Sequence, residues 1–204
     1  MEIKCLSLGN IGTNCYLLST DKAAVVIDPG FYSEETAKFL EQNSLKDKMI
    51  LLTHSHFDHI GDAERLRNLY GAKIGVGVYD NDALANTHKN LANMFGADLK
   101  PFSADITFND LQEFSVGDIC FKVLHTPGHT VGGVCYFTDN NLFSGDTLFF
   151  GSIGRTDFPG GDFAVLKKSV QRLYTLEDDV QVYSGHGPKT TIGYEKNNNP
   201  FIRG

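Results

Sequence analysis

One short loop carries most of the residues in this sequence that could bind a metal ion. Segment 53–59 reads Thr-His-Ser-His-Phe-Asp-His, so three imidazoles and one carboxylate fall within six consecutive residues. His54 and His56 are two positions apart, so their side chains point the same way in an extended loop. Asp58 and His59 are neighbours and can be aimed at a second centre. Because imidazole and carboxylate are common metal ligands, the loop can serve two metal ions.

Three further ligand-type residues follow later in the chain, each just after a predicted strand. They are His129, Asp146 and His186, and a glycine precedes each one. Glycine at that position lets the backbone turn sharply and approach a metal closely. Sites in layered α/β proteins lie beyond the strand ends, so we expect these residues to meet the loop at 53–59. His88 and His125 are interpreted instead as a surface histidine and a hydrogen-bonded structural histidine.

The apolar pattern indicates the elements that must position these residues. It predicts strands over 3–8, 15–19, 23–27, 49–52, 73–78, 121–124, 134–138, 142–144 and 180–183. Helices are predicted over 33–42, 62–70, 162–174 and 190–198, with Ser33 at the start of the first and Gly71 at the end of the second. The polar segment 79–95 is predicted to form helices or loops near the mouth of the site. Strands followed by helices occur twice, which fits two sheets packed face to face.

The motif HxHxDH after an apolar strand resembles the signature of the metallo-β-lactamase superfamily. The later His, Asp and His of that signature are also matched in order, so the resemblance covers most of the chain. It implies an α+β fold, the four-layer αββα sandwich, in a single domain over 1–204. It also implies two metal ions, the first held by His54, His56 and His129 and the second by Asp58, His59 and His186, with Asp146 bridging both.

Two bound cations supply the nucleophile in a site of this kind. The seven ligands offer nitrogen and oxygen atoms, which suit zinc and also iron or manganese. Such cations lower the pKa of a shared water to give a metal-bridging hydroxide, and one of them polarises the substrate carbonyl. Asp58 and Asp146 are the predicted catalytic carboxylates, and no Ser, Cys or Lys nucleophile is required.

Two residues outside the ligand set are also candidates. Asp28 ends a predicted strand, where a carboxylate can orient a ligand imidazole, as the resemblance also implies; a turn-forming role before Pro29 is the alternative. Arg155 lies in a glycine-rich loop after the strand of Asp146. It is a candidate clamp for a substrate carboxylate, and an ion pair with Asp157 or another loop acid is the alternative.

Within the superfamily, the C-terminal half resembles glyoxalase II and its shorter relatives. The matching segments are Gly-Ser-Ile-Gly-Arg-Thr-Asp at 151–157, Gly-His-Gly-Pro-Lys-Thr-Thr-Ile-Gly-Tyr-Glu at 185–195 and Asn-Pro-Phe at 199–201. This resemblance implies a thioester hydrolase with a 2-hydroxyacyl-glutathione type of substrate. The longer glyoxalase II enzymes carry a further helical domain that helps to hold glutathione. We expect no such domain here, because the sequence given extends only to Gly204, so the identity of the thiol stays open.

Three other functions stay open at the level of sequence. A persulfide dioxygenase shares the fold and a similar Gly-Arg-Thr-Asp stretch but uses one iron ion. A lactone or ester hydrolase, or a β-lactamase, is the second alternative, and segments 154–157 and 190–193 argue against it by resemblance. A non-catalytic metal-binding module is the third, and the complete ligand set argues against it. A thiol leaves as a thiolate with a pKa of about 8.5, so the site chemistry favours a thioester over an amide.

Composition limits the expected partners and location. The formal net charge is -7, the isoelectric point is about 5.4 and there is no run of Lys or Arg, so no nucleic-acid partner is expected. We expect no membrane association, no signal peptide and a cytoplasmic location, because no apolar stretch approaches ~18 residues. Cys5, Cys15, Cys120 and Cys135 lie in or near apolar stretches and are predicted to be small buried residues without disulfides.

Overall fold

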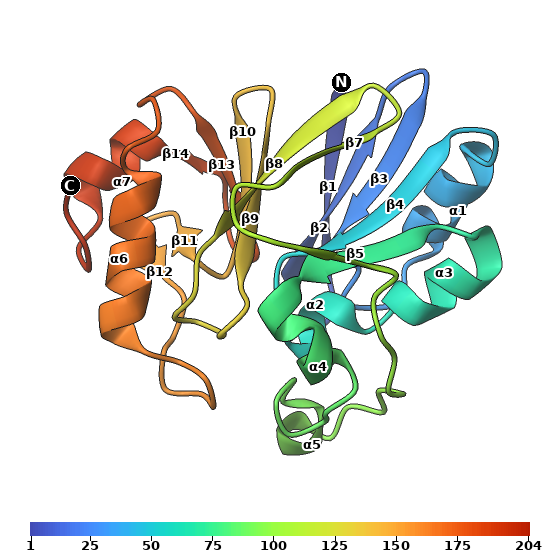
Figure 1. Ribbon diagram of the computed structural model, residues 1–204, viewed down its shortest axis with the longest axis horizontal. Coiled ribbons are helices and arrows are strands. Elements are labelled where there is room, and N and C mark those ends of the chain that lie inside the picture. Colours follow the sequence, from blue (N-terminus) through green and yellow to red (C-terminus); the bar gives the residue numbers. More distant parts are fainter.

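The computed structural model describes all residues, 1–204, and contains two six-stranded β-sheets that pack against each other (Figure 1). The first sheet contains, in spatial order, β1 (Glu2–Leu8), β2 (Thr13–Ser19), β3 (Ala23–Ile27), β4 (Asp47–Leu52), β5 (Lys73–Gly77) and β6 (Ile106–Phe108). Strands β1 to β3 are antiparallel, whereas β3 to β6 are parallel. Parallel neighbours need crossover connections, and α1 (Glu34–Gln42) and α3 (Ala63–Tyr70) supply the first two.

The second sheet is mostly antiparallel. Its spatial order is β14 (Thr190–Thr191), β13 (Gln181–Ser184), β10 (Asn141–Gly145), β9 (Val134–Thr138), β8 (Ile119–His125) and β7 (Glu113–Val116). Only β10 and β13 run parallel, and the crossover between them contains α6 (Phe163–Leu173) and the small hairpin of β11 (Leu148–Phe149) and β12 (Ser152–Ile153).

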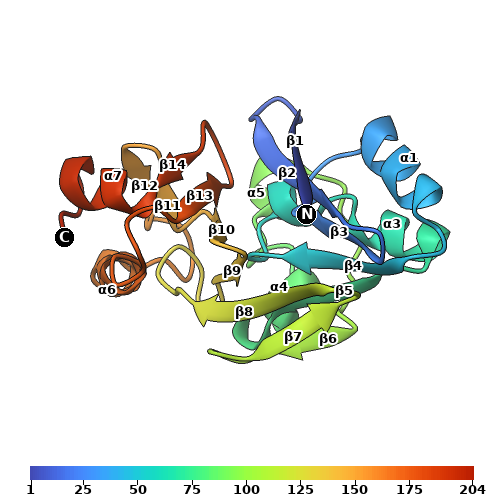
Figure 2. The same ribbon diagram turned by 90° about the horizontal axis from the view of Figure 1, so that it is seen from above.

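Three hydrophobic cores fill the spaces between the layers. The central core lies between the sheets and joins Val25 and Leu51 of the first sheet to Phe121 and Tyr136 of the second. A second core lies between the first sheet and helices α1 and α3, and a third lies between the second sheet and helices α6 and α7 (Ile192–Asn198). Viewed from above, α1 and α3 lie on the opposite side of the molecule from α6 and α7 (Figure 2). The predicted α+β fold and four-layer αββα sandwich are therefore confirmed.

The central strands are apolar without interruption because both of their faces are buried. On β4, Leu51 belongs to the central core, whereas its neighbours Ile50 and Leu52 belong to the core beneath the helices. Successive side chains of a strand point to opposite faces, so a doubly covered strand reads as a continuous apolar run. This run delivers the chain directly to the ligand loop.

Most helix ends lie where the sequence predicts them. Ser33 caps α1 and Asp162 caps α6, each accepting a hydrogen bond from the backbone N–H three residues later. Gly71 ends α3 in the left-handed conformation, with φ of 66°. The last predicted helix starts later than expected, because residues 190–191 first add β14 to the second sheet and Thr191 then caps α7.

The segment between β5 and β6 contains only short helical turns. They are η1 (Val78–Asp80), α4 (Asn81–Leu84) and α5 (Ala92–Phe95), which lie at the lower edge of the molecule in Figure 1, near α2 (Phe57–Ile60). Leu91 and Phe95 line the pocket over the ligand cluster. The predicted helical or loop insertion at the mouth of the site is thus what the structure contains.

The prediction of four buried cysteines was wrong for two of them. Cys15 and Cys135 are buried, but Cys5 and Cys120 are exposed, and all four are free. Cys120 lies on β8, where buried and outward-facing side chains alternate, and Cys5 lies on the largely exposed edge strand β1. An apolar neighbourhood in the sequence therefore did not determine the face of the strand. The structure has no helix with the length and apolar character needed to span a membrane.

Candidate metal centre

The ligand loop begins where β4 ends and continues into the one-turn helix α2. His54 and His56 lie on its extended part, with ring centroids 4.8 Å apart. Asp58 and His59 lie on the helical turn, and both are buried. One segment thus presents four candidate ligands beside the carboxyl end of the first sheet.

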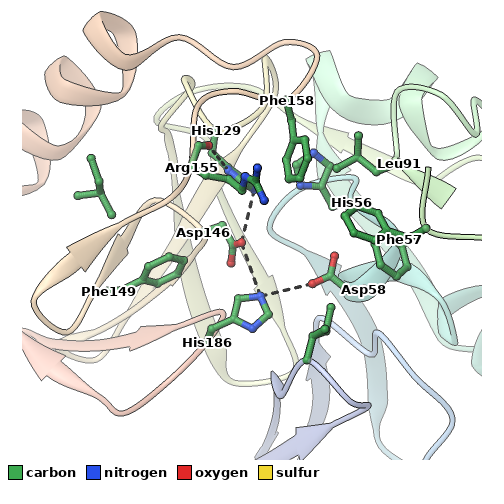
Figure 3. Close-up of a pocket in the computed structure, with 13 residues that line it drawn as sticks. His56, Phe57, Asp58, Leu91, His129, Asp146, Phe149, Arg155, Phe158 and His186 are labelled. Carbon is green, nitrogen blue, oxygen red and sulfur yellow. Dashed lines mark hydrogen bonds and ion pairs between the residues drawn. The ribbon is translucent and has the colours of Figure 1, made fainter. Parts of the chain in front are cut away.

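The second sheet delivers three more candidate ligands to the same place. His129 follows β8, Asp146 follows β10 and His186 follows β13. Oδ2 of Asp146 lies 3.4 Å from Nε2 of His129 and 3.6 Å from Nε2 of His186. Figure 3 shows Asp146 between these two histidines. Its other oxygen, Oδ1, lies 3.4 Å from Nε2 of His59. Asp146 therefore occupies the position of a ligand shared between two groups.

All seven predicted residues come together in space. Their ligand atoms form two trios, each with members within 4.8 Å of one another: His54, His56 and His129, and Asp58, His59 and His186. These are the two ligand sets that the resemblance implies. His88 and His125 stay outside, because His88 is exposed and Nε2 of His125 bonds the carbonyl oxygen of Val131.

Five buried polar atoms at the centre of this cluster lack a hydrogen-bond partner. They are Nε2 of His54, His56, His59 and His129, and Oδ1 of Asp146. Buried polar atoms in proteins are almost always paired, so five unpaired atoms converging on one place indicate a further partner. Each can offer a lone pair to a cation. The residues therefore fit a divalent-metal centre.

The other ring nitrogens are held in ways that suit metal binding. Nδ1 of His59 donates to Oδ2 of Asp28 over 2.9 Å, and Nδ1 of His129 donates to the carbonyl oxygen of Arg155 over 2.7 Å. An imidazole that donates from Nδ1 leaves Nε2 free to bind a metal. These two contacts aim both rings into the cluster.

Asp28 supports the ligand loop through a second residue as well. Thr53 donates to the buried Asp28 carboxylate from its backbone N over 2.8 Å and from Oγ1 over 2.6 Å. Since that hydroxyl donates to Asp28, it accepts from Nδ1 of His54 at 3.1 Å. Asp28 also has φ of 54°, a turn conformation uncommon outside glycine. The residue thus combines the orienting contact and the turn geometry that the sequence left as alternatives.

The charge of the cluster is arranged for cation binding. Burial lowers the pKa of His54 well below its usual value and the pKa of His56 to about 3, so both rings stay neutral. Burial opposes ionisation of Asp146, but the imidazoles around it, His59 first, lower its pKa well below the usual value. Burial also disfavours a charged His59, yet the neighbouring carboxylates raise its pKa well above normal, so a metal ion at Nε2 would take the place of a proton. Buried carboxylates without Lys or Arg partners need positive charge, which divalent cations bring.

Asp80 is a buried carboxylate that the sequence reasoning missed. Its Oδ2 accepts from the backbone N of Ser55 and from Oγ1 of Thr130, each over 2.9 Å, and its Oδ1 accepts from the backbone N of Gly132 over 2.7 Å. It therefore ties the ligand loop to the loop that carries His129. The only signal in the sequence is its position shortly after a strand, which it shares with Asp28.

Arg155 has the geometry of the predicted ion pair. It is exposed and bonds Asp157 twice, Nε to Oδ1 over 2.7 Å and Nη2 to Oδ2 over 2.5 Å. Its guanidinium also lies over the ring of Phe158, 3.8 Å from the centroid. The contact of Arg155 with the ligand His129 is made by its backbone carbonyl, not by its side chain.

A pocket of about 400 Å³ opens onto the ligand cluster (Figure 3). Besides the ligands, its lining is mainly apolar and includes Phe57, Leu91, Phe95, Phe149 and Phe158. Phe57 and Phe158 lie on the side of His56, and Phe149 lies on the opposite side. The size and lining are those of a small-molecule site.

Fold and ligand set together define the class of protein. The sequence matches the metallo-beta-lactamase superfamily over residues 8–186, which is most of the chain. The chain therefore belongs to this superfamily, and it is a metallo-hydrolase in fold and in the chemistry of its ligand set.

Three relatives match the chain over nearly its whole length. Hydroxyacylglutathione hydrolase GloC of Haemophilus influenzae is 38% identical over 208 residues, covering 99% of this chain and 98% of its own. The crystal structure of the B3 metallo-beta-lactamase BLEG-1 is 38% identical, has a TM-score of 0.92 and covers 100% of both chains. The crystal structure of TTHA1623 in a di-iron-bound form is 34% identical, has a TM-score of 0.86 and covers 98% of this chain and 100% of that one. Their names differ in substrate and metal, so similarity alone does not decide either.

Proposed function

We propose that this protein is a dinuclear metal-dependent hydrolase that cleaves a thioester. The observation that carries the proposal is the pair of ligand trios joined by Asp146, which lies near His129 of the first trio and near His59 and His186 of the second. A centre for one metal would leave the second trio without a purpose. The similarity to GloC supports a 2-hydroxyacyl-glutathione type of substrate.

The proposed cofactors are two divalent ions held by the seven ligands. Zinc is our first choice, and iron and manganese stay alternatives, since nitrogen and oxygen ligands suit all three and TTHA1623 has a di-iron form. When bound, such ions supply a water of lowered pKa as nucleophile and a Lewis acid for the carbonyl.

The residues of the chain would hold the metal ions, orient the substrate and keep water out of the site. Burial favours the neutral forms of Asp58 and Asp146, but neighbouring imidazoles keep the pKa of both carboxylates below normal, so both are ionised at neutral pH. The apolar lining limits access of bulk water to the site. Apart from the ligands, Arg155 is the only ionisable residue that lines the pocket, and a guanidinium does not give up a proton. A thiolate leaving group, with a pKa of about 8.5, does not need that proton.

The proposed partner is a small-molecule thioester, in keeping with the size of the pocket. We propose no nucleic-acid or membrane partner for the site, whose pocket lining includes only one cationic side chain apart from the histidines. The cytoplasmic location stays a prediction.

A hydrolase of lactones, esters or β-lactams is the second candidate. It is favoured by the 38% identity to BLEG-1, which equals the identity to GloC. A mononuclear iron persulfide dioxygenase is the third candidate, and the number of metal ions bound per chain distinguishes it from the two-metal hydrolase.

The test couples metal analysis to turnover. We expect about two metal ions per chain in metal-replete protein, thiol release from S-lactoylglutathione or a related thioester, and loss of both in Asp146→Ala. Protein treated with EDTA is the control for metal dependence, and Asp82→Ala is the control for a surface carboxylate of the nearby helix α4.

Each alternative function predicts a different result in this test. One metal per chain with full hydrolytic activity contradicts the two-metal proposal. Bound iron, sulfite formation from glutathione persulfide and no thioester turnover would establish the dioxygenase. Faster turnover of a lactone or a β-lactam than of any thioester would establish the second candidate.

A further inference from the structure

Three phenylalanines that line the pocket adjoin one another and form a continuous wall. Two of them, Phe57 and Phe158, are seen beside the ligand His56 in Figure 3. The rings of Phe57 and Phe95 are stacked, with centroids 5.1 Å apart and an angle of 24° between planes. Phe95 meets Phe158 edge to face at 6.0 Å, and Phe158 meets His56 edge to face at 5.9 Å. This aromatic wall, defined as Phe57, Phe95 and Phe158, connects the metal ligands to the pocket mouth.

The aromatic wall has no part in the folding cores. None of its side chains belongs to any of the three hydrophobic cores. The rings come from three separate segments, which are α2, α5 and the loop before α6. Phe95 is 54% exposed. Phe57 and Phe158 are partly buried, and adjoining aromatic rings that are exposed or partly exposed in a concave site are typical of a surface that a ligand covers.

Few charged side chains line the pocket outside the ligand set. No lysine lines the pocket, and the one guanidinium there, of Arg155, is engaged by Asp157 through two hydrogen bonds. The same guanidinium stacks on Phe158, which holds that ring in the wall. Outside the ligand set, the lining therefore offers a substrate apolar contact rather than ion pairs.

We propose that the aromatic wall binds an aromatic group of the substrate next to the scissile thioester bond. This inference rests on the proposed function, because it assigns a substrate class to the same site. The group belongs either to the acyl part or to the thiol part, since both present the same flat, apolar face. Aromatic rings pack favourably when offset or edge to face at about 4.5–7 Å, so the exposed face of Phe95 is suited to receive one.

The test uses pairs of thioesters that differ in one group. Lactoyl and mandeloyl thioesters of one thiol replace methyl by phenyl on the acyl side, and lactoyl thioesters of ethanethiol and benzyl mercaptan test the thiol side. We expect metal-replete protein to favour the phenyl member of at least one pair about tenfold or more in kcat/KM. Phe95→Ala should lower kcat/KM for the phenyl member about three- to tenfold more than for the methyl member.

The chain offers a matched control for Phe95. Phe150 is 47% exposed and stacks on Tyr194 with centroids 5.1 Å apart and 17° between planes, but it does not line the pocket. Phe150→Ala should leave the phenyl preference as in the original protein. Phe95→Leu keeps apolar bulk without the ring and should lose part of the preference, which separates ring stacking from simple burial.

The outcomes separate this inference from the proposed function. Equal kcat/KM within both pairs would overturn the aromatic-wall inference and leave the thioester hydrolase intact. No turnover of any thioester by metal-replete protein would overturn the proposed function. The aromatic-wall inference would then be tested by ligand binding. Calorimetric titration with S-benzyl and S-methyl thioglycolate should show tighter binding of the benzyl compound, lost in Phe95→Ala; equal binding would overturn the inference.

Discussion

The two halves of the ligand set are built in different ways. The first half is one continuous segment, 54–59, which follows β4 and contains four of the seven candidate ligands. The second half, called the divided half below, consists of His129, Asp146 and His186, which come from three separate strand ends of the second sheet. The first half can move as a unit, whereas each ligand of the second half depends on its own strand. The two halves therefore need different supports.

Buried carboxylates support the continuous half from outside. Asp28 bonds Thr53 and His59, and Asp80 bonds the backbone of Ser55. These contacts set the path of the loop and the rotation of its rings. Removing a hydrogen bond of Asp28 or Asp80 should therefore displace the ligands of the continuous half.

Glycines support the divided half by leaving space. A Cβ on Gly145 would overlap Oγ1 of Thr53, and a Cβ on Gly185 would overlap Oδ1 of Asp146 and lie 2.7 Å from Cε1 of His59. The strand ends of the second sheet can reach the ligand loop only because these side chains are absent. Adding a Cβ at Gly145 or Gly185 should therefore displace the ligands of the divided half.

Gly185→Ala should have the largest effect of the changes that test this comparison. The added methyl must displace Asp146, and displacement of a reacting group by about 1 Å can cost on the order of 100-fold in activity. Metal content measured after dialysis should also fall. Gly187→Ala is the control, because a Cβ there meets no atom within 4 Å although φ is 74°. Full metal content and activity in Gly185→Ala would contradict the close-approach argument.

Asp28→Asn should have an intermediate effect. An amide nitrogen in place of Oδ2 cannot accept from His59, and loss of such an orienting partner typically costs about 10- to 100-fold in metal affinity or activity. Competition with a chelator measures the affinity. Asp62→Asn is the control, because Asp62 is similarly buried, at 4% exposure against 2% for Asp28, but pairs with Arg65. If both variants bind metal equally well, Asp28 does not orient the centre.

Asp80→Asn should have the smallest effect on activity and a clear effect on stability. The carboxylate accepts three hydrogen bonds from two loops, and leaving one buried donor unpaired costs about 1–3 kcal/mol. Chemical denaturation of the metal-replete protein measures this loss. Since Asp80 contacts no ligand ring, metal affinity should fall less than in Asp28→Asn. A larger fall than in Asp28→Asn would reverse the ranking of the two carboxylates.

The sequence predicts the continuous half far better than the divided half. Four ligand types within six residues form a local pattern, and local spacing limits where side chains can point. His129, Asp146 and His186 were found through strand ends and a resemblance, and their distances to the loop were not predictable from spacing. The exposure of Cys5 and Cys120 was predicted wrongly for a related reason, since an apolar run does not show which face of a strand is covered.

The sequence by itself determined the segment 54–59 with its four candidate ligands, the apolar strands and the caps that start the helices. All of these depend on residues close together in the chain. Tertiary structure alone decided that Asp80 joins two loops and that three phenylalanines meet beside His56. These contacts join segments far apart in sequence, so they form only when the two sheets pack and bring their strand ends together.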